Sequence, residues 1–434
     1  MNWELKYENK IVSAEQAMKS IVSNTKIFIT GNASTPTPLL QPLADRAREL
    51  ENLTASMVLA FGDMPIVDEG MEKHIKVNAL FMGHNVRKAV SEGRADYTPI
   101  FLSEIPELYR SDKSLRPDVA LVHVSPPDEH GFCSFGCEVG ISKPAAQTAR
   151  IVIAEVNEQM PRSLGDSFIH VNRLTHMVPT NRPLPEVSQG KIDPTSQKIA
   201  EIVSTNLVHD GDTLQLGIGA IADGVLKNGV NDKRDLGIHS EMFSDGVVKL
   251  LENGVITNEK KTTHHGKIIA GFFFGSKEIY KFVHNNPIFE LHPTDYVNDP
   301  FVIAKNDNMV AINSAIEVDL TGQVVADSIG QRFYSGIGGQ VDFIRGAARS
   351  KNGRPIIALP ATTKNDTISK IVPTLKPGAG VVTSRGDVHY VVTEFGIAKL
   401  HGRSIRERTK AMISIAHPKF QDELTNYAKK HNMI

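Results

Sequence analysis

An α/β fold with two similar domains and mostly parallel sheets is predicted by three features of the sequence. Short apolar segments of strand length alternate with helix-like segments, which is typical of parallel βαβ units. The order of several motifs in the first half of the chain recurs in the second half. The length of 434 residues is too great for one ordinary hydrophobic core, so two domains are expected.

The first half contains predicted helices and strands in alternation. Ser13 is the expected N-cap of the first helix, because its hydroxyl can accept a bond from a free N–H group there. The predicted helices are Lys10–Ser23, Leu39–Leu50 and Val86–Glu92. The predicted strands are Lys26–Thr30, Thr54–Ala60, Lys76–Met82, Tyr97–Leu102, Val119–Val124 and Ile151–Val156.

A proline-rich stretch, Pro179–Pro194, separates the halves and reads as an extended linker. Asp193 is the expected N-cap of a new helix, with Pro194 in its first turn. We therefore predict an N-terminal domain over residues 1–185 and a C-terminal domain over residues 186–434.

Four segments of the first half have counterparts in the same order in the second half, which indicates an internal duplication. The alignment matches Glu241 with Asp63. Glycine turns are denser in the second half, so the chemistry is expected there, in an active-site cleft between the domains. The matched pairs are Lys26–Ala33 with Thr213–Gly219, Val58–Met64 with Leu236–Met242, Lys76–Gly83 with Lys267–Gly275, and Val119–Gly131 with Val310–Gly322.

The stretch after the linker carries the strongest candidate site. A strand, Thr213–Leu216, enters a glycine turn that is followed by a helix-like run, Ile221–Leu226. A second short strand, Leu236–His239, stops at Ser240 and Glu241. Gly217-x-Gly219-x-x-Ala222 fits the dinucleotide fingerprint, with Glu241 near the position of the acidic residue that binds a ribose.

Acyl chemistry is the alternative interpretation. A glutamate between a strand and a helix lies in the positive field of the helix N-terminus, which favours the ionised, nucleophilic form. Backbone N–H groups of glycine turns can stabilise an oxyanion. A second glycine cluster, Tyr334–Gln340, fits this chemistry and has no place in a dinucleotide site. On the residues alone, Glu241 as a solvated turn residue stays open.

Composition and spacing exclude several other classes. A net charge of -1 gives no basic field for nucleic acid or a membrane surface. Cys133 and Cys137 lack metal or redox spacing and read as two packed thiols. No apolar run resembles a signal peptide or a spanning helix, so a cytoplasmic protein is expected. His264-His265 reads as a polar turn, and no metal site is predicted.

Five segments together resemble the family I CoA-transferases. The nearest group is the acetyl-CoA hydrolase/transferases, and within it the 4-hydroxybutyrate CoA-transferases. The resemblance spans the whole chain. The segments are Pro126–Gly136 (PPDEHGFCSFG), the turn Gly217–Ile221 (GIGAI), Leu236–Met242 (LGIHSEM), Ser335–Phe343 (SGIGGQVDF) and Val391–Gly402 (VVTEFGIAKLHG).

The resemblance implies a reaction and a set of residues. Glu241 would attack an acyl-CoA, and CoA would pass through a glutamyl-CoA thioester to a short carboxylate such as acetate, butyrate or 4-hydroxybutyrate. No metal, redox group or permanently bound cofactor is implied, and the enzymes assemble as homodimers or larger homo-oligomers. The implied CoA-binding residues are Gly217, Ile218, Gly219, Ala220, Ile221, Ala222, Asn313, Gly336, Gly338, Gly339 and Lys364.

Alternatives and secondary candidates stay open beside this reading. An acetyl-CoA hydrolase would use the same intermediate, and a non-catalytic CoA- or nucleotide-binding protein would use the turns alone. Gln215 and His239 are expected to position the turn, and Glu394 to be structural. His84, Asn85 and the turn Asp128–His130 are candidates for lining the cleft from the first domain.

Overall fold

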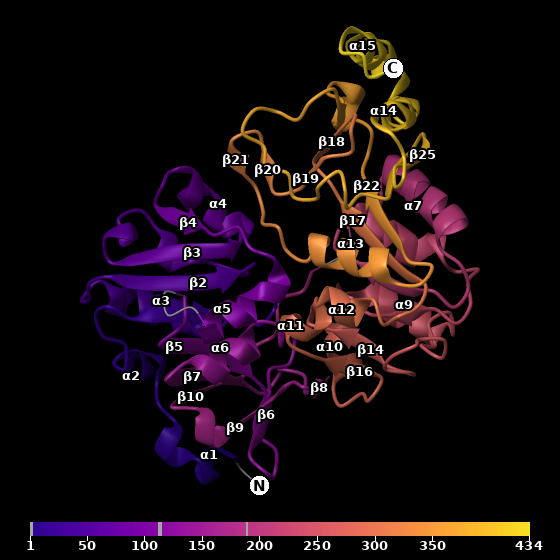
Figure 1. Ribbon diagram of the computed structural model, residues 1–434. Coiled ribbons are helices and arrows are strands. Elements are labelled where there is room, and N and C mark those ends of the chain that lie inside the picture. The colour runs from indigo at the N-terminus through magenta and orange to yellow at the C-terminus, as the bar shows by residue number, and fades with distance from the viewer. Residues whose placement is uncertain (1–2, 112–114, 188–189) are drawn as a thin grey trace. The chain divides into compact units, whose positions relative to one another are not determined.

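The computed structural model describes residues 3–111, 115–187 and 190–434 (Figure 1). The chain divides into two compact units, Met1–Ser188 with Ile269–Val297, and Gln189–Ile268 with Asn298–Ile434. The division falls near the predicted boundary, but the structure groups Ile269–Val297 with the first unit, whereas the prediction includes this segment in the C-terminal domain. Strand β16 (Phe289–Leu291) of this segment pairs with β8 (Leu164–Gly165) of the first unit.

The first unit is built on a seven-stranded parallel sheet with the order β10-β7-β5-β1-β2-β3-β4. This confirms the parallel sheet expected from alternating strands and helices. Its strands are β1 (Lys26–Ile29), β2 (Leu53–Val58), β3 (Ile75–Phe81), β4 (Ala95–Tyr97), β5 (Val119–Val124), β7 (Ile151–Asn157) and β10 (His176–Thr180). Strand β4 ends earlier than predicted, because Pro99 lies just beyond Tyr97 and has no N–H for a sheet.

Short helices and small sheets complete the first unit. Ser13 caps α2 as predicted, and Gln16 completes a capping box. The helices are α1 (Trp3–Lys6), α2 (Ala14–Met18), α3 (Thr37–Ala47), α4 (His84–Ser91), α5 (Ile105–Ser111), α6 (Ser142–Thr148), α10 (Lys277–Val283) and α11 (Thr294–Val297). The remaining strands are β6 (Phe132–Ser134), β9 (Phe168–His170), β14 (Ile268–Ala270) and β15 (Phe272–Phe273).

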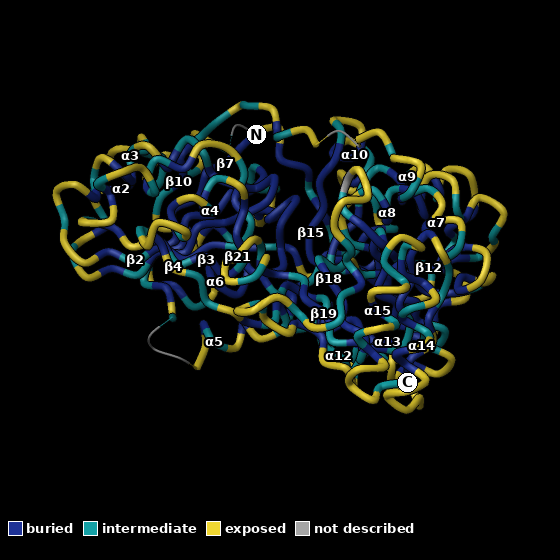
Figure 2. Tube along the Cα trace, turned by 90° about the horizontal axis from the view of Figure 1, so that it is seen from above, coloured by how far each residue is buried: buried dark blue, intermediate teal, exposed yellow. Residues whose placement is uncertain are grey.

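A continuous core lies between the central strands of the first unit and their helices. Ile27, Ala55 and Val77, on adjacent strands, pack with Leu40 and Leu43 of α3. Burying such apolar side chains is the main favourable term in folding. Figure 2 shows the same distribution, with buried strands in the sheet and more exposed backbone in the outer loops.

The second unit is built on a six-stranded sheet with the order β12-β11-β17-β22-β24-β25, in which only β25 is antiparallel. Asp193 caps α7 and Pro194 opens it, as predicted. The sheet strands are β11 (Thr213–Leu216), β12 (Gly237–Ile238), β17 (Met309–Ser314), β22 (Arg354–Ala358), β24 (Tyr390–Thr393) and β25 (Gly396–Lys399). The helices are α7 (Pro194–Leu207), α8 (Ala220–Gly224), α9 (Asp245–Glu252), α12 (Pro300–Ile303), α13 (Gln340–Arg349), α14 (Ile405–Ser414) and α15 (Pro418–Lys430).

The smaller strands of this unit lie mainly between β17 and α13 and after β22. They are β13 (Met242–Phe243), β18 (Glu317–Asp319), β19 (Val324–Val325), β20 (Ser328–Ile329), β21 (Arg332–Phe333) and β23 (Ile371–Val372). Across the described residues of both units, no helix has the length and apolar character needed to cross a membrane.

The strand orders of the two sheets agree with the predicted duplication. In the first unit β2, β1, β5, β7 and β10 are neighbours in that order, and β12, β11, β17, β22 and β24 repeat it. One predicted match is wrong. The segment Lys267–Gly275 was expected to repeat β3 beside β12, but its strand β14 belongs to a separate sheet with β16 and β8.

Candidate active site

Glu241 stands where the edge strand β12 leaves the sheet of the second unit. After Ile238, the His239 N–H donates to the carbonyl of Leu214 on β11, at 3.2 Å. The Ser240 hydroxyl donates to the Leu216 carbonyl at 3.1 Å and accepts from the Leu216 N–H at 3.3 Å. The two residues before Glu241 are therefore fixed against the last residues of β11.

The Glu241 carboxylate is held by two groups from distant parts of the chain. The side-chain amide of Asn298 donates to Oε2 at 3.0 Å, and the backbone N–H of Gly339 donates to the same carboxyl group. Asn298 is fully buried. A Cβ on Gly339 would overlap the Glu241 carboxylate and the Asn298 amide, so a side chain here would displace both groups.

Burial raises the pKa of Glu241 to about 7, and the hydrogen bonds from Asn298 and Gly339 oppose this only in part. The residue keeps some solvent exposure, but its carboxyl group lies among protein atoms. The expectation that a helix field would favour the ionised form is therefore wrong in its net effect. The helix that follows, α9, begins only at Asp245, and the carboxylate instead rests at the start of α13.

The first glycine turn is open, as expected for a segment that approaches a ligand. Gly217 and Gly219 have no neighbouring atoms where a side chain would project, and Gly219 has a φ of 121° that favours glycine. Ile218 between them is exposed, whereas Ile221 and Ala222 are buried in the helix that begins at Ala220. Only the turn itself is therefore available to a ligand.

The second glycine cluster contains Gly336, Gly338 and Gly339 and ends at the start of α13. Gly338 adopts a φ of 61°, which few other residues adopt without strain. The Gln340 side chain donates to the Ser314 carbonyl at 2.7 Å and accepts from Thr383 at 3.0 Å. These bonds fix the start of α13, and with it the N–H group that binds Glu241.

The other predicted residues have varied surroundings. Asn313 pairs with Gln215 through their side-chain amides, with one bond of 3.0 Å, at the ends of the adjacent strands β17 and β11. His239 is buried with its ring edge-on to Phe343, so its side chain packs against α13. Glu394 accepts from the Ala361 N–H at 2.9 Å and so holds the backbone there. Lys364 begins the 3-10 helix Lys364–Asp366, but its side chain lies outside the described part of the structure.

The first-unit candidates lie in loops and turns, except His84 and Asn85, which begin α4. Asp63, matched to Glu241 by the duplication, is exposed. Asn85 donates to the carbonyls of Ala60 and Gly62 and so holds the loop after β2. Asp128 accepts from the His130 and Phe132 N–H groups, which confirms the predicted turn.

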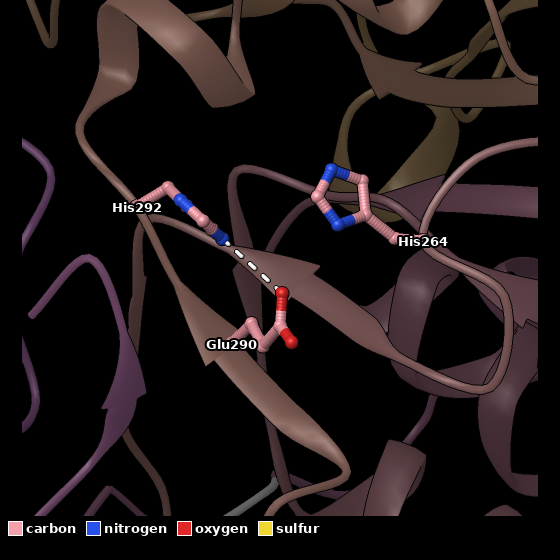
Figure 3. A group of neighbouring side chains, drawn as sticks. All are labelled: His264, Glu290 and His292. Atoms are coloured by element: carbon pink, nitrogen blue, oxygen red, sulfur yellow. Dashed lines mark ion pairs between the residues drawn. The ribbon is translucent and has the colours of Figure 1, made fainter.

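His264 and His265, for which a polar turn is predicted, lie in the second unit, and a further histidine, His292, lies beside a glutamate in the first. His264 has a φ of 51° in the predicted turn, and His265 is 3.4 Å from the Glu259 carboxylate. In the first unit, His292 Nε2 lies 3.5 Å from Glu290 of β16 (Figure 3). The pair is an ion pair only when His292 is protonated.

Sequence reasoning missed Asn298 and Gln340, although both shape the site. Asn298 lies 57 residues beyond Glu241, in a segment with no glycine or motif signal. Gln340 directly follows the second glycine cluster, so its position in the quoted segment was the one available signal. Neither role can be read without the tertiary contacts.

Comparison with known proteins identifies the family. Residues 1–188 match the N-terminal domain model of the acetyl-CoA hydrolase/transferases, and residues 275–428 match the C-terminal domain model. The 4-hydroxybutyrate coenzyme A transferase of Clostridium kluyveri is 49% identical over 430 residues, covering 99% of this chain and 100% of its own. An acetyl-CoA hydrolase of Kluyveromyces lactis is 28% identical, over 80% of this chain and 73% of its own.

Solved structures agree with this result. RipA from Yersinia pestis superposes with a TM-score of 0.93 at 36% identity, covering 100% of both chains. The 4-hydroxybutyrate CoA-transferase of Porphyromonas gingivalis superposes with a TM-score of 0.85 at 40% identity, covering 99% of this chain and 100% of its own. With both domain models matched and full-length relatives of this similarity, the chain belongs to the acetyl-CoA hydrolase/transferase family.

Proposed function

We propose that the protein is an acyl-CoA:carboxylate CoA-transferase that uses Glu241 as its nucleophile. The observation that carries the proposal is the Glu241 carboxyl group, which is enclosed at the start of α13 and bonded by Asn298 and Gly339. A carboxyl group with a pKa of about 7 is ionised in a large fraction of molecules at neutral pH. It also retains more basicity than an ordinary carboxylate, which favours attack.

The first half-reaction loads CoA onto the enzyme. An oxygen of the Glu241 carboxylate attacks the thioester carbonyl of the acyl-CoA, and the C–S bond breaks to release CoA thiolate and leave an acyl-glutamyl anhydride. The thiolate then attacks the glutamyl carbonyl of this anhydride. The C–O bond breaks, the first carboxylate leaves, and a glutamyl-CoA thioester remains.

The contacts of Oε2 assign separate tasks to the two carboxyl oxygens. Asn298 binds Oε2, so Oε1 is the oxygen with freedom to attack. When thiolate later adds to the glutamyl carbonyl, negative charge develops on the oxygen that is not transferred. The Asn298 amide, which binds Oε2, would stabilise that charge, and the Gly339 N–H, which binds the same carboxyl group, would assist it, as in an oxyanion hole.

The second half-reaction is the reverse with a new carboxylate. The acceptor carboxylate attacks the glutamyl-CoA thioester and CoA thiolate leaves. The thiolate then attacks the acyl carbonyl of the new anhydride, which forms the product acyl-CoA and restores the Glu241 carboxylate. Electrons and atoms balance without a metal or a redox cofactor, and none is included in the proposal.

CoA would lie along the glycine turns of the second unit. The open turn Gly217–Gly219 offers backbone N–H groups to a ligand, and Ala220, Ile221 and Ala222 continue it into α8. Gly336 and Gly338 lie just before Gly339, which belongs to the proposed oxyanion hole. Asn313 lies near the end of β17, the strand beside β11. We assign Lys364 to CoA on the resemblance alone.

The substrates follow from the relatives. The relative with the higher identity is named a 4-hydroxybutyrate CoA-transferase, so acetyl-CoA with 4-hydroxybutyrate or butyrate is the expected pair. Acetyl-CoA hydrolysis is the second candidate, because water can attack the same intermediate. We further propose that the protein is cytoplasmic and forms a homo-oligomer. Light scattering of the purified protein would test the oligomeric state.

Trapping of the intermediate tests the proposal. The protein is incubated with acetyl-CoA and treated with borohydride, which reduces a glutamyl thioester to an alcohol and releases CoA. Mass spectrometry should find the reduced side chain at Glu241, and Glu241→Gln should lose about 10³-fold or more in rate. Glu252→Gln at the exposed end of α9 serves as the control.

The outcomes separate the candidates. Formation of 4-hydroxybutyryl-CoA or butyryl-CoA, with release of acetate, when the matching carboxylate is added to acetyl-CoA supports the transferase. Thiol release without any added carboxylate supports the hydrolase. An unmodified Glu241 together with full activity in Glu241→Ala would overturn the assignment of the nucleophile. Substrate binding without turnover would support a binding protein instead.

A further inference from the structure

Among the described residues, no full strand covers the outer edge of β12, the strand that leads to Glu241. In the first unit, the equivalent strand β2 pairs with β3 along its whole length, from Leu53↔Ile75 to Val58↔Phe81. In the second unit the equivalent edge makes one parallel bridge, Leu236↔Ile256. The chain then turns away, and residues 257–267 form an irregular loop.

Two side chains of this loop make the hydrogen bonds that a neighbouring strand would make. The side-chain oxygen Oδ1 of Asn258 accepts from the Ile238 N–H at 3.0 Å. The ammonium group of Lys261 donates to the Ile238 carbonyl at 2.9 Å and to the Lys267 carbonyl at 2.7 Å. Both polar groups of Ile238 on this edge are thus bonded by side chains.

Both side chains are buried, so these contacts are part of the interior. Asn258 has no exposed surface, and Lys261 is 4% exposed. A buried ammonium group is costly unless it is hydrogen-bonded, and here two backbone carbonyls receive it. Gly237 is the residue that makes room, because a Cβ there would overlap the Lys261 side chain.

The loop itself is closed and so can hold a fixed position. The Asn258 N–H donates to the Leu236 carbonyl at 3.0 Å, and the Asn258 carbonyl accepts from Gly266 at 3.1 Å and from Lys261 at 3.3 Å. Asn258 has a φ of 60°, a conformation that asparagine tolerates better than most residues. Backbone bonds therefore support both side chains.

We propose that Asn258 and Lys261 are positioning residues for Glu241, a pair that clamps Ile238 from the outer side of the sheet. The inference rests on the proposed function of Glu241. Ile238 is three residues before Glu241, and the two residues between them, His239 and Ser240, are already bonded to β11. The clamp on the outer side completes the fixing of this segment against Asn298 and Gly339.

A small displacement of the carboxylate would affect catalysis more than binding. The proposed oxyanion donors come from other segments, so moving β12 alone would change their distances to Glu241. A displacement of about 1 Å at a reacting group can cost roughly 10²-fold in rate. The glycine turn at Gly217 follows β11, which is held on its other side by β17, so CoA affinity should change little.

The test compares Lys261→Met with Lys260→Met. Methionine keeps much of the length of lysine but cannot donate, and the neighbouring Lys260 is exposed. Lys261→Met should lower kcat by about 10- to 100-fold, with KM for acetyl-CoA within about twofold of wild type. Lys260→Met should match wild type in both.

Rate per active site separates positioning from folding. The fraction of molecules trapped by borohydride counts competent sites, and kcat is divided by that fraction. A normal rate per trapped site would overturn the proposal, because the substitution would then only reduce the amount of folded protein. Asn258→Ala is the second variant, and a wild-type rate per site in it would equally contradict the clamp.

Wild-type enzyme in the same experiment distinguishes a failure of the proposed function from a failure of the positioning role. If wild type forms no adduct at Glu241, the proposed function fails. If wild type is trapped at Glu241 and both clamp variants turn over normally, the function stands and the positioning role alone is refuted. A reduced rate per site in both variants, with unchanged KM, supports the clamp.

Discussion

Replacing Glu241 with glutamine should make the stability of the protein less dependent on pH while abolishing transfer. Burial raises the pKa of this carboxyl group from 4.5 to about 7. Between these values the folded state holds a proton that the unfolded chain has released, so the free energy of unfolding falls as the pH rises. The stabilisation is complete below the unfolded pKa and is lost as the pH passes the folded one.

The expected magnitude follows from the same two pKa values. A tenfold change in proton affinity corresponds to about 1.36 kcal/mol. The free energy of unfolding of the wild type should therefore be lower by roughly 3 kcal/mol at high pH than at low pH. About 2.5 kcal/mol of this is lost between about pH 5 and about pH 8.5. Because the residue keeps some solvent exposure, screening reduces the effect, and we expect ~1–3 kcal/mol.

The assay is urea unfolding of wild type and Glu241→Gln at both pH values. Far-ultraviolet circular dichroism is suitable, since the single tryptophan, Trp3, lies in the other unit. Glutamine leaves an amide hydrogen without an obvious acceptor, so the absolute stabilities can differ for other reasons. The quantity tested is the change in their difference between the two pH values.

A difference that stays constant with pH would refute the reasoning, because it would mean that Glu241 has an ordinary pKa in the folded protein. A difference of the opposite sign would show that the hydrogen bonds from Asn298 and Gly339 outweigh burial. Glu252→Gln, at an exposed position, should show no comparable dependence and controls for the loss of one charge.

Further predictions concern the same site. The kcat/KM for acetyl-CoA should rise with pH through about 7, because only ionised Glu241 attacks; a flat profile from pH 5 to 8 would contradict the pKa. Asn298→Ala should lower kcat by roughly 10²- to 10³-fold and shift this profile to higher pH, and an unchanged profile would remove Asn298 from the site. Gly339→Ala should lose most activity and roughly 1–3 kcal/mol of stability through overlap with Glu241, as thermal unfolding would show. Gly217→Ala has open space, so its stability should match wild type while its KM for acetyl-CoA rises.

The parts of this site that are predictable from sequence are those made by adjacent residues. A strand, a glycine turn and a helix start form one local pattern. The predicted position of the turn Gly217–Gly219 between β11 and α8 is confirmed, and the turn is open in the structure. Glu241 is a candidate from sequence because the duplication and the family motif mark the same segment, and its role stays a prediction. The parallel strand order follows for the same reason, since alternating strands and helices leave few other arrangements.

The parts that failed depend on tertiary contacts. Asn298 reaches Glu241 across 57 residues, and no local pattern announces it. The pKa of Glu241 was expected to fall, because the adjacent sequence shows a helix to follow but not how deeply the carboxyl group is enclosed. The apolar run Lys267–Gly275 had the pattern of β3, but apolar strands do not specify which sheet they join.

That misplaced strand explains why the two halves can hold their equivalent segments so differently. The ladder between β2 and β3 uses backbone groups, which every residue except proline supplies, so substitutions there leave the pairing intact. Ile238 instead depends on the particular side chains of Asn258 and Lys261. In the half that carries the proposed nucleophile, we therefore expect that a single substitution can move the strand before Glu241 while the sheet stays folded. Through the clamp, substitutions at Asn258 or Lys261 can shift the Glu241 carboxylate. The strand before Asp63 is held by backbone bonds to β3, so no such pair of side chains controls the position of Asp63.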